Sequence, residues 1–249
     1  MWPLGGETKS VRGYGKGMTE DIEEAEEWHL DNDRIRSFVD TVDEAANTHE
    51  EIPDLLEALH DPFRDLLTDD DWLPEPYDGL VPDGYDDKGE MGRDIAQWLL
   101  YRRPEKLTLF TLVLPPGVET PVHDHLAWGL VGIYSGTQVE EFYRRADDGD
   151  AHIGHAELEH LRTEENGRGD FYELVPPNND IHKVQTVSDV PSVSVHLLGA
   201  DVGCIQRHQF DPDDSFVELF QSHYTNVRCE TALSPPEDHG HSHSHGHHH

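Results

Sequence analysis

The sequence predicts a mainly β protein, a barrel or sandwich with a helical extension at its N-terminal end. From Leu107 onward, short apolar stretches follow one another, separated by Gly, Pro and Asn, with no helical segment between them. This texture is typical of the strands of a sandwich or barrel. Between Ile22 and Leu67 the apolar residues instead recur at the spacing of amphipathic helices.

Two helical patterns lie in the N-terminal part, one over Ile35, Phe38, Val39 and Val42 and one over Leu55, Leu56, Leu59 and Phe63. Residues 68–90 are rich in Pro, Gly and Asp, which favours a long surface loop. A short helix is expected around Arg93–Arg102. We therefore expect a disordered tail at 1–20, a helical extension with its loop at 21–105, a β-barrel at 106–220 and a disordered His-rich tail at 221–249.

Eight strands are expected in the barrel, and the charged residues 145–170 are expected to form a loop between its two halves. The expected strands are Leu107–Leu114, Val122–His125, Gly129–Tyr134, Gln138–Arg144, Phe171–Val175, Lys183–Val187, Ser192–Leu198 and Gly203–Phe210.

The composition is strongly acidic, with 52 Asp and Glu against 18 Lys and Arg and a formal net charge of -34. Such a charge argues against nucleic acids and anionic membranes as partners, because both are bound by clustered Lys and Arg. It also destabilises the compact state by self-repulsion, which molar salt removes. We therefore expect a protein of a salt-rich, halophile-like cytoplasm; the alternative is an acidic protein that binds a basic partner.

Two further observations favour a cytoplasmic protein. The chain has no apolar run long enough to cross a membrane, and its first residues lack an apolar stretch of signal-peptide length.

Cys204 and Cys229 are too few for a disulfide framework, and Cys204 is expected to be a packing residue. The oligomeric state is not indicated.

A candidate metal site is centred on His123 and His125, which follow Gly117 and precede Gly136. Residues at i and i+2 of a strand point to the same face, so both imidazoles can reach one ion. His182, after a turn-rich segment that begins at Pro177, can supply a third nitrogen. Imidazoles suit Fe, Zn, Ni and Cu, and three protein ligands leave positions open for substrate. The alternative is a structural or surface pair of histidines.

This pattern resembles the first cupin motif, and Pro177 with His182 resembles part of the second. Where many cupins carry a metal-binding Glu, this sequence has Gly129, which leaves three histidines. The string Thr120–Gly136 and the segment DDDWLP at 69–74 resemble the bacterial cysteine and 3-mercaptopropionate dioxygenases. The resemblance implies a cupin double-stranded β-helix, that is, a jelly-roll barrel. It also implies Fe(II) on His123, His125 and His182, and oxidation of a small carboxylate-bearing thiol by O2 to its sulfinic acid.

Downstream residues extend the resemblance. Ser194 and His196 resemble the family's Ser-x-His-x-Tyr relay, although residue 198 is Leu in place of Tyr. Arg207 resembles the family's carboxylate-binding Arg, and a guanidinium can pair with a carboxylate through two hydrogen bonds. Trp128 and Leu198 are expected to form an apolar wall around the substrate. The alternatives are a buried His196 bonded to the backbone and a surface Arg207 paired with an acid.

Two other functions stay open. Leu198 favours a different metal-dependent cupin enzyme, an isomerase or a dioxygenase of carbon acids. The His-rich C-terminus favours a non-catalytic cupin that binds a metal or ligand. In the preferred function the partners are a small-molecule thiol and O2.

Overall fold

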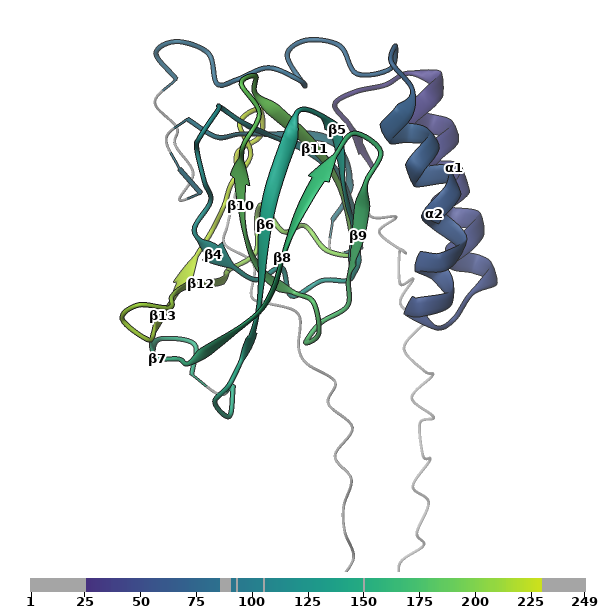
Figure 1. The fold of residues 1–249 in the computed structure, drawn as a ribbon. Helices are drawn as coiled ribbons and strands as arrows, with labels where there is room; N and C mark the ends of the chain where they lie inside the picture. Colours follow the sequence, from purple (N-terminus) through teal and green to yellow (C-terminus); the bar gives the residue numbers. More distant parts are fainter. Residues whose placement is uncertain (1–25, 86–90, 93, 105, 150, 230–249) are drawn as a thin grey trace, which may run out of the picture.

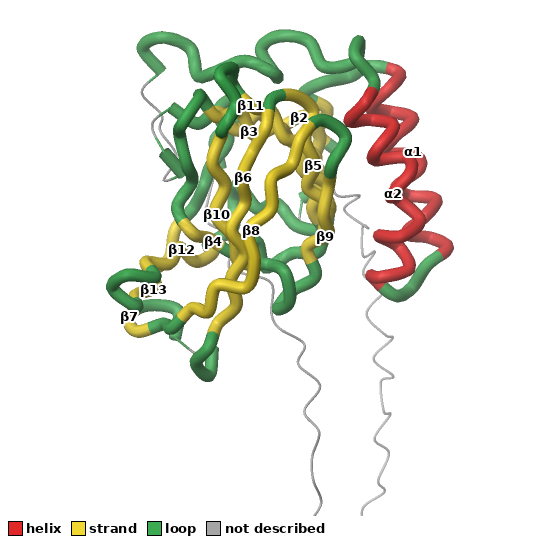
Figure 2. The backbone as a smooth tube through the Cα atoms, viewed as in Figure 1, coloured by secondary structure: helices red, strands yellow, loops and turns green. Residues whose placement is uncertain are grey.

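The protein consists of two antiparallel β-sheets that face each other, with two helices against the outer side of one sheet (Figures 1 and 2). The computed structural model describes residues 26–85, 91–92, 94–104, 106–149 and 151–229. The expected β fold with an N-terminal helical extension is confirmed. Among the described helices, none is long and apolar enough to cross a membrane.

The strand order identifies the fold. The first sheet runs β1 (Glu27–Trp28), β2 (Ala96–Arg103), β3 (Leu107–Leu114), β11 (Ser192–Leu198), β5 (Gly129–Ser135) and β9 (Phe171–Leu174). The second runs β7 (Gly154–His155), β13 (Phe216–Phe220), β12 (Arg207–Asp211), β4 (Val122–His123), β10 (Ile181–Thr186), β6 (Thr137–Arg145) and β8 (Leu158–Gly167). At its centre, β3-β11-β5-β9 faces β4-β10-β6-β8, an eight-stranded jelly roll of the cupin type.

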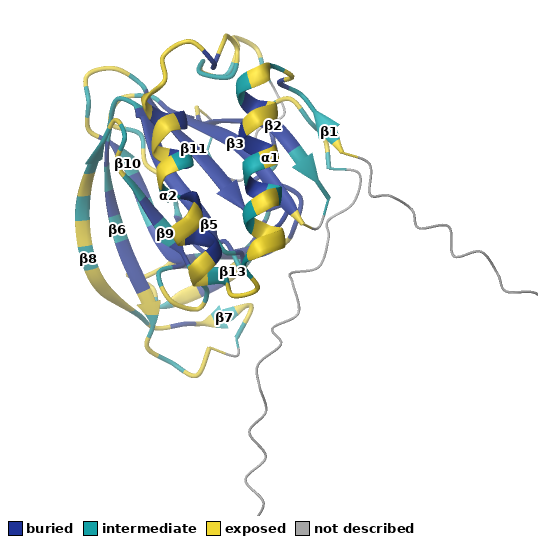
Figure 3. Ribbon diagram, turned by 90° about the vertical axis from the view of Figure 1, so that its right-hand side faces the viewer, coloured by how far each residue is buried: buried dark blue, intermediate teal, exposed yellow. Residues whose placement is uncertain are grey.

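The helices α1 (Asp33–Thr48) and α2 (Ile52–Thr68) form where the apolar periodicity predicts them. Asn32 caps α1, because its side-chain oxygen accepts a hydrogen bond from the Ile35 N–H at 2.9 Å. Both helices turn their buried faces toward the first sheet (Figure 3). There the rings of Phe63 on α2 and Phe171 on β9 lie 5.7 Å apart.

The first sheet separates two apolar cores, and strand β11 shows how. Val193, Val195 and Leu197 belong to the outer cluster, between the sheet and the helices. The alternate residue Leu198 belongs to the inner cluster, inside the barrel. Because side chains alternate along a strand, Ser194 and His196 share the inner face with Leu198. The strand period therefore places these two polar residues inside the barrel.

Two expected elements are wrong. The segment expected as a helix at Arg93–Arg102 contains β2, since its apolar run is buried on both faces and such a run fits either period. The segment expected as a loop at 145–170 contains β8, a charged and largely exposed strand with no apolar alternation. The short strands β1, β7 and β13 were not expected either.

The C-terminal part of the barrel extends further than expected. We expected a tail from residue 221, but within 221–229 Ser222 and Tyr224 are buried. This segment bonds to β2: the Thr225 N–H donates to the Gln97 carbonyl oxygen at 2.7 Å. Cys204 and Cys229 form a disulfide, a pairing that the sequence does not predict. The expected tails at 1–20 and 230–249 lie outside the described residues.

Candidate metal centre

Three histidines meet inside the barrel, as the sequence predicts. His123 on β4 is paired directly with His182 on β10, and His125 follows β4 by two residues. The ring centroids are 5.0 Å apart for His123 and His125, and 4.8 Å apart for each of them and His182. All three side chains are buried, and one nitrogen of each lies within 4.8 Å of the other two. The geometry is that of three ligands around one ion.

Hydrogen bonds at Nδ1 turn the Nε2 atoms of all three rings toward the centre. Nδ1 of His123 bonds to the Pro121 carbonyl oxygen at 2.9 Å, and Nδ1 of His125 to the Asp180 carbonyl oxygen at 3.1 Å. Nδ1 of His182 contacts the Tyr172 hydroxyl at 3.0 Å. His182 Nε2 is buried and has no hydrogen-bond partner among the described residues. A buried polar atom without a partner is costly, and a metal ion would supply one.

Burial favours the neutral form of two of these imidazoles, those of His123 and His125. Burial, together with the nearby charges of His182 and Arg207, lowers the pKa of His123 and His125 well below the ordinary value of 6.5. A histidine must be deprotonated at the nitrogen that binds a metal, so a lowered pKa removes the competing proton at neutral pH. The donor set therefore fits a first-row transition metal such as Fe, Zn, Ni or Cu.

The absence of a side chain at Gly129 has a structural reason. A Cβ atom there would lie 2.3 Å from the Leu197 carbonyl oxygen and 2.3 Å from Leu198 Cδ2. Leu198 itself is fully buried in the inner cluster. A glutamate ligand at position 129 is thus excluded by backbone and side chain of β11, which leaves the three histidines as the ligand set.

The expected contact between Ser194 and His196 is present. The Ser194 hydroxyl lies 2.9 Å from His196 Nε2, and both side chains are buried. The imidazole stacks on Phe110 with 4.6 Å between ring centroids, and its Nδ1 has no partner in the described part of the chain. Burial and the charges of His125 and His182 lower the pKa of His196 well below its usual range. This neutral imidazole can offer a hydrogen bond inside the barrel.

Arg207 is fully buried on β12 and reaches the metal strand. Its Nη1 donates to the carbonyl oxygen of Asp124, the residue between two of the histidines. Nε donates to the Val202 carbonyl oxygen at 3.1 Å, and Nη2 to the Ser222 hydroxyl at 2.9 Å. Among the described residues no carboxylate forms an ion pair with this guanidinium, and burial lowers its pKa to about 10. Arg207 is therefore a buried cation bonded to backbone and hydroxyl oxygens, with Asp124 and Asp180 as nearby carboxylates, and not a surface residue paired with an acid.

Trp128 does not join these residues. It is half-buried and packs against the outer cluster, whereas Leu198 lies in the inner one. Its indole fills the space beside Gly199, where an added Cβ would lie 2.2 Å from Trp128 Nε1. Trp128 and Leu198 thus lie on opposite sides of the first sheet, and of the two only Leu198 shares the inner cluster.

Three buried polar residues behind the histidines were missed. Asp180 accepts hydrogen bonds from the backbone N–H groups of His125 at 3.0 Å and Leu126 at 3.2 Å. Glu140 on β6 is fully buried, and its Oε2 lies 3.6 Å from His182 Nδ1. Tyr172 on β9 contacts the same nitrogen. A sequence signal existed for Glu140, which shares the inward-facing register of β6 with Gln138 and Phe142.

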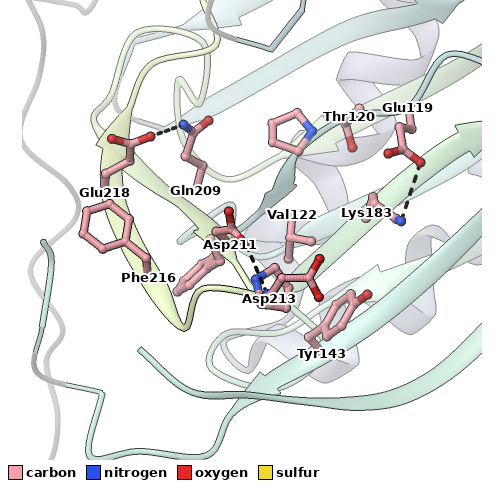
Figure 4. Close-up of a pocket in the computed structure, with 13 residues that line it drawn as sticks. Glu119, Thr120, Val122, Tyr143, Lys183, Gln209, Asp211, Asp213, Phe216 and Glu218 are labelled. Atoms are coloured by element: carbon pink, nitrogen blue, oxygen red, sulfur yellow. Dashed lines mark hydrogen bonds and ion pairs between the residues drawn. The ribbon is translucent and has the colours of Figure 1, made fainter. Parts of the chain in front are cut away.

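A separate cavity of about 480 Å³ lies outside the barrel (Figure 4). Tyr143, Lys183 and several acidic residues line it, and Lys183 forms an ion pair with Glu119 at 3.5 Å. Val122 also lines it, and alternation along β4 turns the next residue, His123, to the other side. No residue expected at the metal centre faces this cavity.

No protein-family model matches the chain. Solved structures similar to it include the Cnp3 cupin domain of Schizosaccharomyces pombe, at 11% identity and TM-score 0.33, over 43% of this chain and 61% of that one. An RmlC-like cupin-family protein with a double-stranded β-helix from Methanocaldococcus jannaschii matches at 14% and 0.32, over 49% and 94%. A structure of oxalate oxidase matches at 16% and 0.30, over 38% and 42%.

The chain spans less than two thirds of the length of the oxalate oxidase and of the Cnp3 domain. These likenesses are low, and no function is transferred from them. The jelly roll follows from the strand order of this chain, and the metal centre from the geometry of its own histidines.

Proposed function

We propose that the protein is a non-haem iron dioxygenase that oxidises a small thiol bearing a carboxylate, of the cysteine or 3-mercaptopropionate type. The reaction is RSH + O2 → RSO2H, in which both oxygen atoms enter the product. His123, His125 and His182 would hold the iron through Nε2. A bound Fe(II) ion supplies Lewis acidity toward the thiol and the electron-transfer chemistry that O2 requires.

The observation that carries the proposal is the buried cation beside the histidines. A buried guanidinium that forms no ion pair is costly, and an incoming carboxylate that pairs with it would lower that cost. Since Arg207 donates to the backbone of Asp124, its positive charge lies one residue from His123 and one from His125. A thiol acid held at Arg207 by its carboxylate would bring its sulfur close to the histidines, on which the charge of Arg207 already acts.

The remaining inner residues orient the substrate and exclude water. Leu198 belongs to an apolar cluster with Phe142 and Tyr172, whose rings lie 5.9 Å from that of His182. His196, fixed by Ser194 and by stacking on Phe110, presents Nδ1 as a hydrogen-bonding group. This arrangement holds the reacting groups together in a dry site, which replaces a bimolecular encounter by a positioned one.

The test is oxygen uptake by the iron-loaded protein with a panel of thiols. We expect uptake with 3-mercaptopropionate or cysteine, one sulfinate formed per O2, and much less with 2-mercaptoethanol, which lacks the carboxylate. His182→Ala is the control. Full iron loading with no uptake from any thiol would contradict the proposal.

One observation favours a second function, another metal-dependent cupin enzyme. The resemblance to thiol dioxygenases implies a phenol at position 198, and this chain has a buried Leu there. Tyr172 does not replace that phenol, because its hydroxyl contacts His182 at Nδ1, on the side opposite Nε2. Turnover of a carbon acid by the same iron-loaded protein, without any thiol oxidation, would support this alternative.

A further inference from the structure

Behind His182, inside the second sheet, lies a fully buried glutamate side chain. Glu140 is fully buried on β6, directly beside β10, and forms no ion pair with Lys or Arg among the described residues. Its Oε1 accepts a hydrogen bond from Asn166 Nδ2 at 3.4 Å, while Oε2 is buried without a hydrogen-bond partner in the part of the chain that the structure describes. The nearest imidazole nitrogen is His182 Nδ1, 3.6 Å from Oε2.

The Tyr172 side chain contacts the same nitrogen atom, His182 Nδ1. Its hydroxyl lies 3.0 Å from His182 Nδ1, and its ring packs edge-on against Phe142 with 5.0 Å between centroids. Burial first, and then the charge of Glu140, raise the pKa of Tyr172 well above its ordinary value, so the phenol keeps its proton. The nearby cation, Arg162, is paired with Glu164 at 2.8 Å and lies over the Phe142 ring.

The proton directions follow from the geometry of His182. When Nε2 holds a metal ion, the ring carries its proton on Nδ1. The Nδ1–H then donates to the Tyr172 oxygen, and the Tyr172 hydroxyl can turn its own proton toward Glu140, with which it interacts. These hydrogen bonds at Nδ1 increase the electron density on Nε2. Nε2 therefore becomes a stronger ligand for a cation.

The charge of a bound metal ion also favours a carboxyl group beside His182. A divalent ion on three neutral imidazoles places two positive charges in a buried site, and buried charges are stable only when they are compensated. Glu140 is a carboxyl group that contacts His182 at Nδ1, and it could supply part of that compensation when an ion is bound.

We propose that Glu140, together with Tyr172 at the same nitrogen, is a positioning residue of the metal centre that fixes His182 and offsets one charge of the bound ion. The inference concerns metal binding and goes beyond the proposed reaction, because it holds for whatever the metal does.

The test compares Glu140→Gln and Tyr172→Phe with the wild type in two measurements on the full chain. The first is the dissociation constant for Co²⁺ alone, from its visible absorption, with the signal of His182→Ala subtracted to remove binding by the C-terminal histidines. The second is the melting temperature of the metal-free protein. Glu141→Gln is the matched control, since Glu141 is the next residue on β6 and bonds to Tyr143 and Lys183 on the other face.

We expect both variants to bind Co²⁺ about 10- to 100-fold more weakly, and the control to bind it as the wild type does. We expect Glu140→Gln not to lower the melting temperature of the metal-free protein, because Oε2, the atom that faces His182, forms no hydrogen bond that the substitution would remove. A purely structural role would instead lower that temperature and leave the dissociation constant unchanged, and this result would overturn the proposal. If the wild type binds no more Co²⁺ than His182→Ala does, the three histidines do not form a metal centre.

Discussion

His123 and His182 face each other as a directly opposed pair across β4 and β10, with 4.8 Å between their ring centroids. They are 59 positions apart in the sequence, and only the pairing of these two strands brings them together. His125 completes the triangle from the residues after β4. The metal centre is thus a product of sheet register, and a shift of either strand by one residue would turn its histidine out of the barrel.

Replacement of Arg207 tests the carboxylate site. We expect Arg207→Gln to raise KM for 3-mercaptopropionate by roughly 10- to 100-fold, because a charge-assisted hydrogen bond contributes about 1.5–3 kcal/mol. Ser222→Ala, which removes one acceptor of the guanidinium, should raise KM less. Steady-state kinetics measure both effects. An unchanged KM in Arg207→Gln would mean that the acid is bound elsewhere.

The disulfide between Cys204 and Cys229 should contribute to stability. The two cysteines are 25 positions apart, and closing a loop of this size in the unfolded chain corresponds to about 3 kcal/mol. Urea unfolding with and without dithiothreitol measures this. Cys204→Ser/Cys229→Ser should match the reduced wild type and be insensitive to the reductant; equal stability of the oxidised and reduced wild type would contradict the expectation.

Acid should destabilise the metal-free protein through its buried imidazoles. His123, His125 and His196 have a lowered pKa in the folded state. Below pH 6.5 the unfolded chain therefore binds more protons at these sites than the folded one, and stability falls as the pH falls. Asp180, whose pKa burial raises to about 6, opposes this effect with one proton between about pH 4 and 6.

The measurement for this prediction is the free energy of unfolding between pH 7 and 5. His196→Gln should flatten the dependence by up to about 1.4 kcal/mol per pH unit, the value for one proton. A variant curve parallel to that of the wild type would mean that His196 takes up its proton in the folded protein as easily as in the unfolded one.

Salt should stabilise the fold. With a formal net charge of -34, repulsion between surface carboxylates opposes compaction, and at 1 M salt the screening length falls to about 3 Å. Thermal unfolding in KCl from 0.1 to 3 M tests this expectation. A melting temperature that is highest below about 0.15 M would instead favour the acidic protein that binds a basic partner.

The sequence predicted the strands that carry the metal ligands better than it predicted the edges of the sheets. The bounds of β3 and β11 were predicted residue for residue, because both are apolar runs bounded by turn residues. In β2 an equally apolar run was assigned to a helix, since burial on both faces leaves no alternation to distinguish the two periods. The exposed edge strand β8 has only two apolar residues, Leu158 and Leu161, and no apolar alternation to reveal it.

The residues of the candidate site also divide into those that the sequence predicted and those that it did not. The spacing of His123 and His125 predicted two of the three histidines that the fold brings together, and the Pro-rich turn before His182 predicted the third. Glu140, Tyr172 and Asp180 contact these histidines only through the pairing and packing of the strands, which local spacing does not encode. The position of Trp128 in the outer cluster likewise depends on which sheet face is covered by the helices.

The most direct test of the metal centre is the metal content of the full chain after loading with Fe(II) without oxygen. Wild type and His182→Ala are compared, because both keep the C-terminal histidines and any loose binding there cancels. We expect the wild type to retain one more equivalent of iron than the variant after gel filtration. Equal iron content in the two proteins would show that the three imidazoles do not bind the ion.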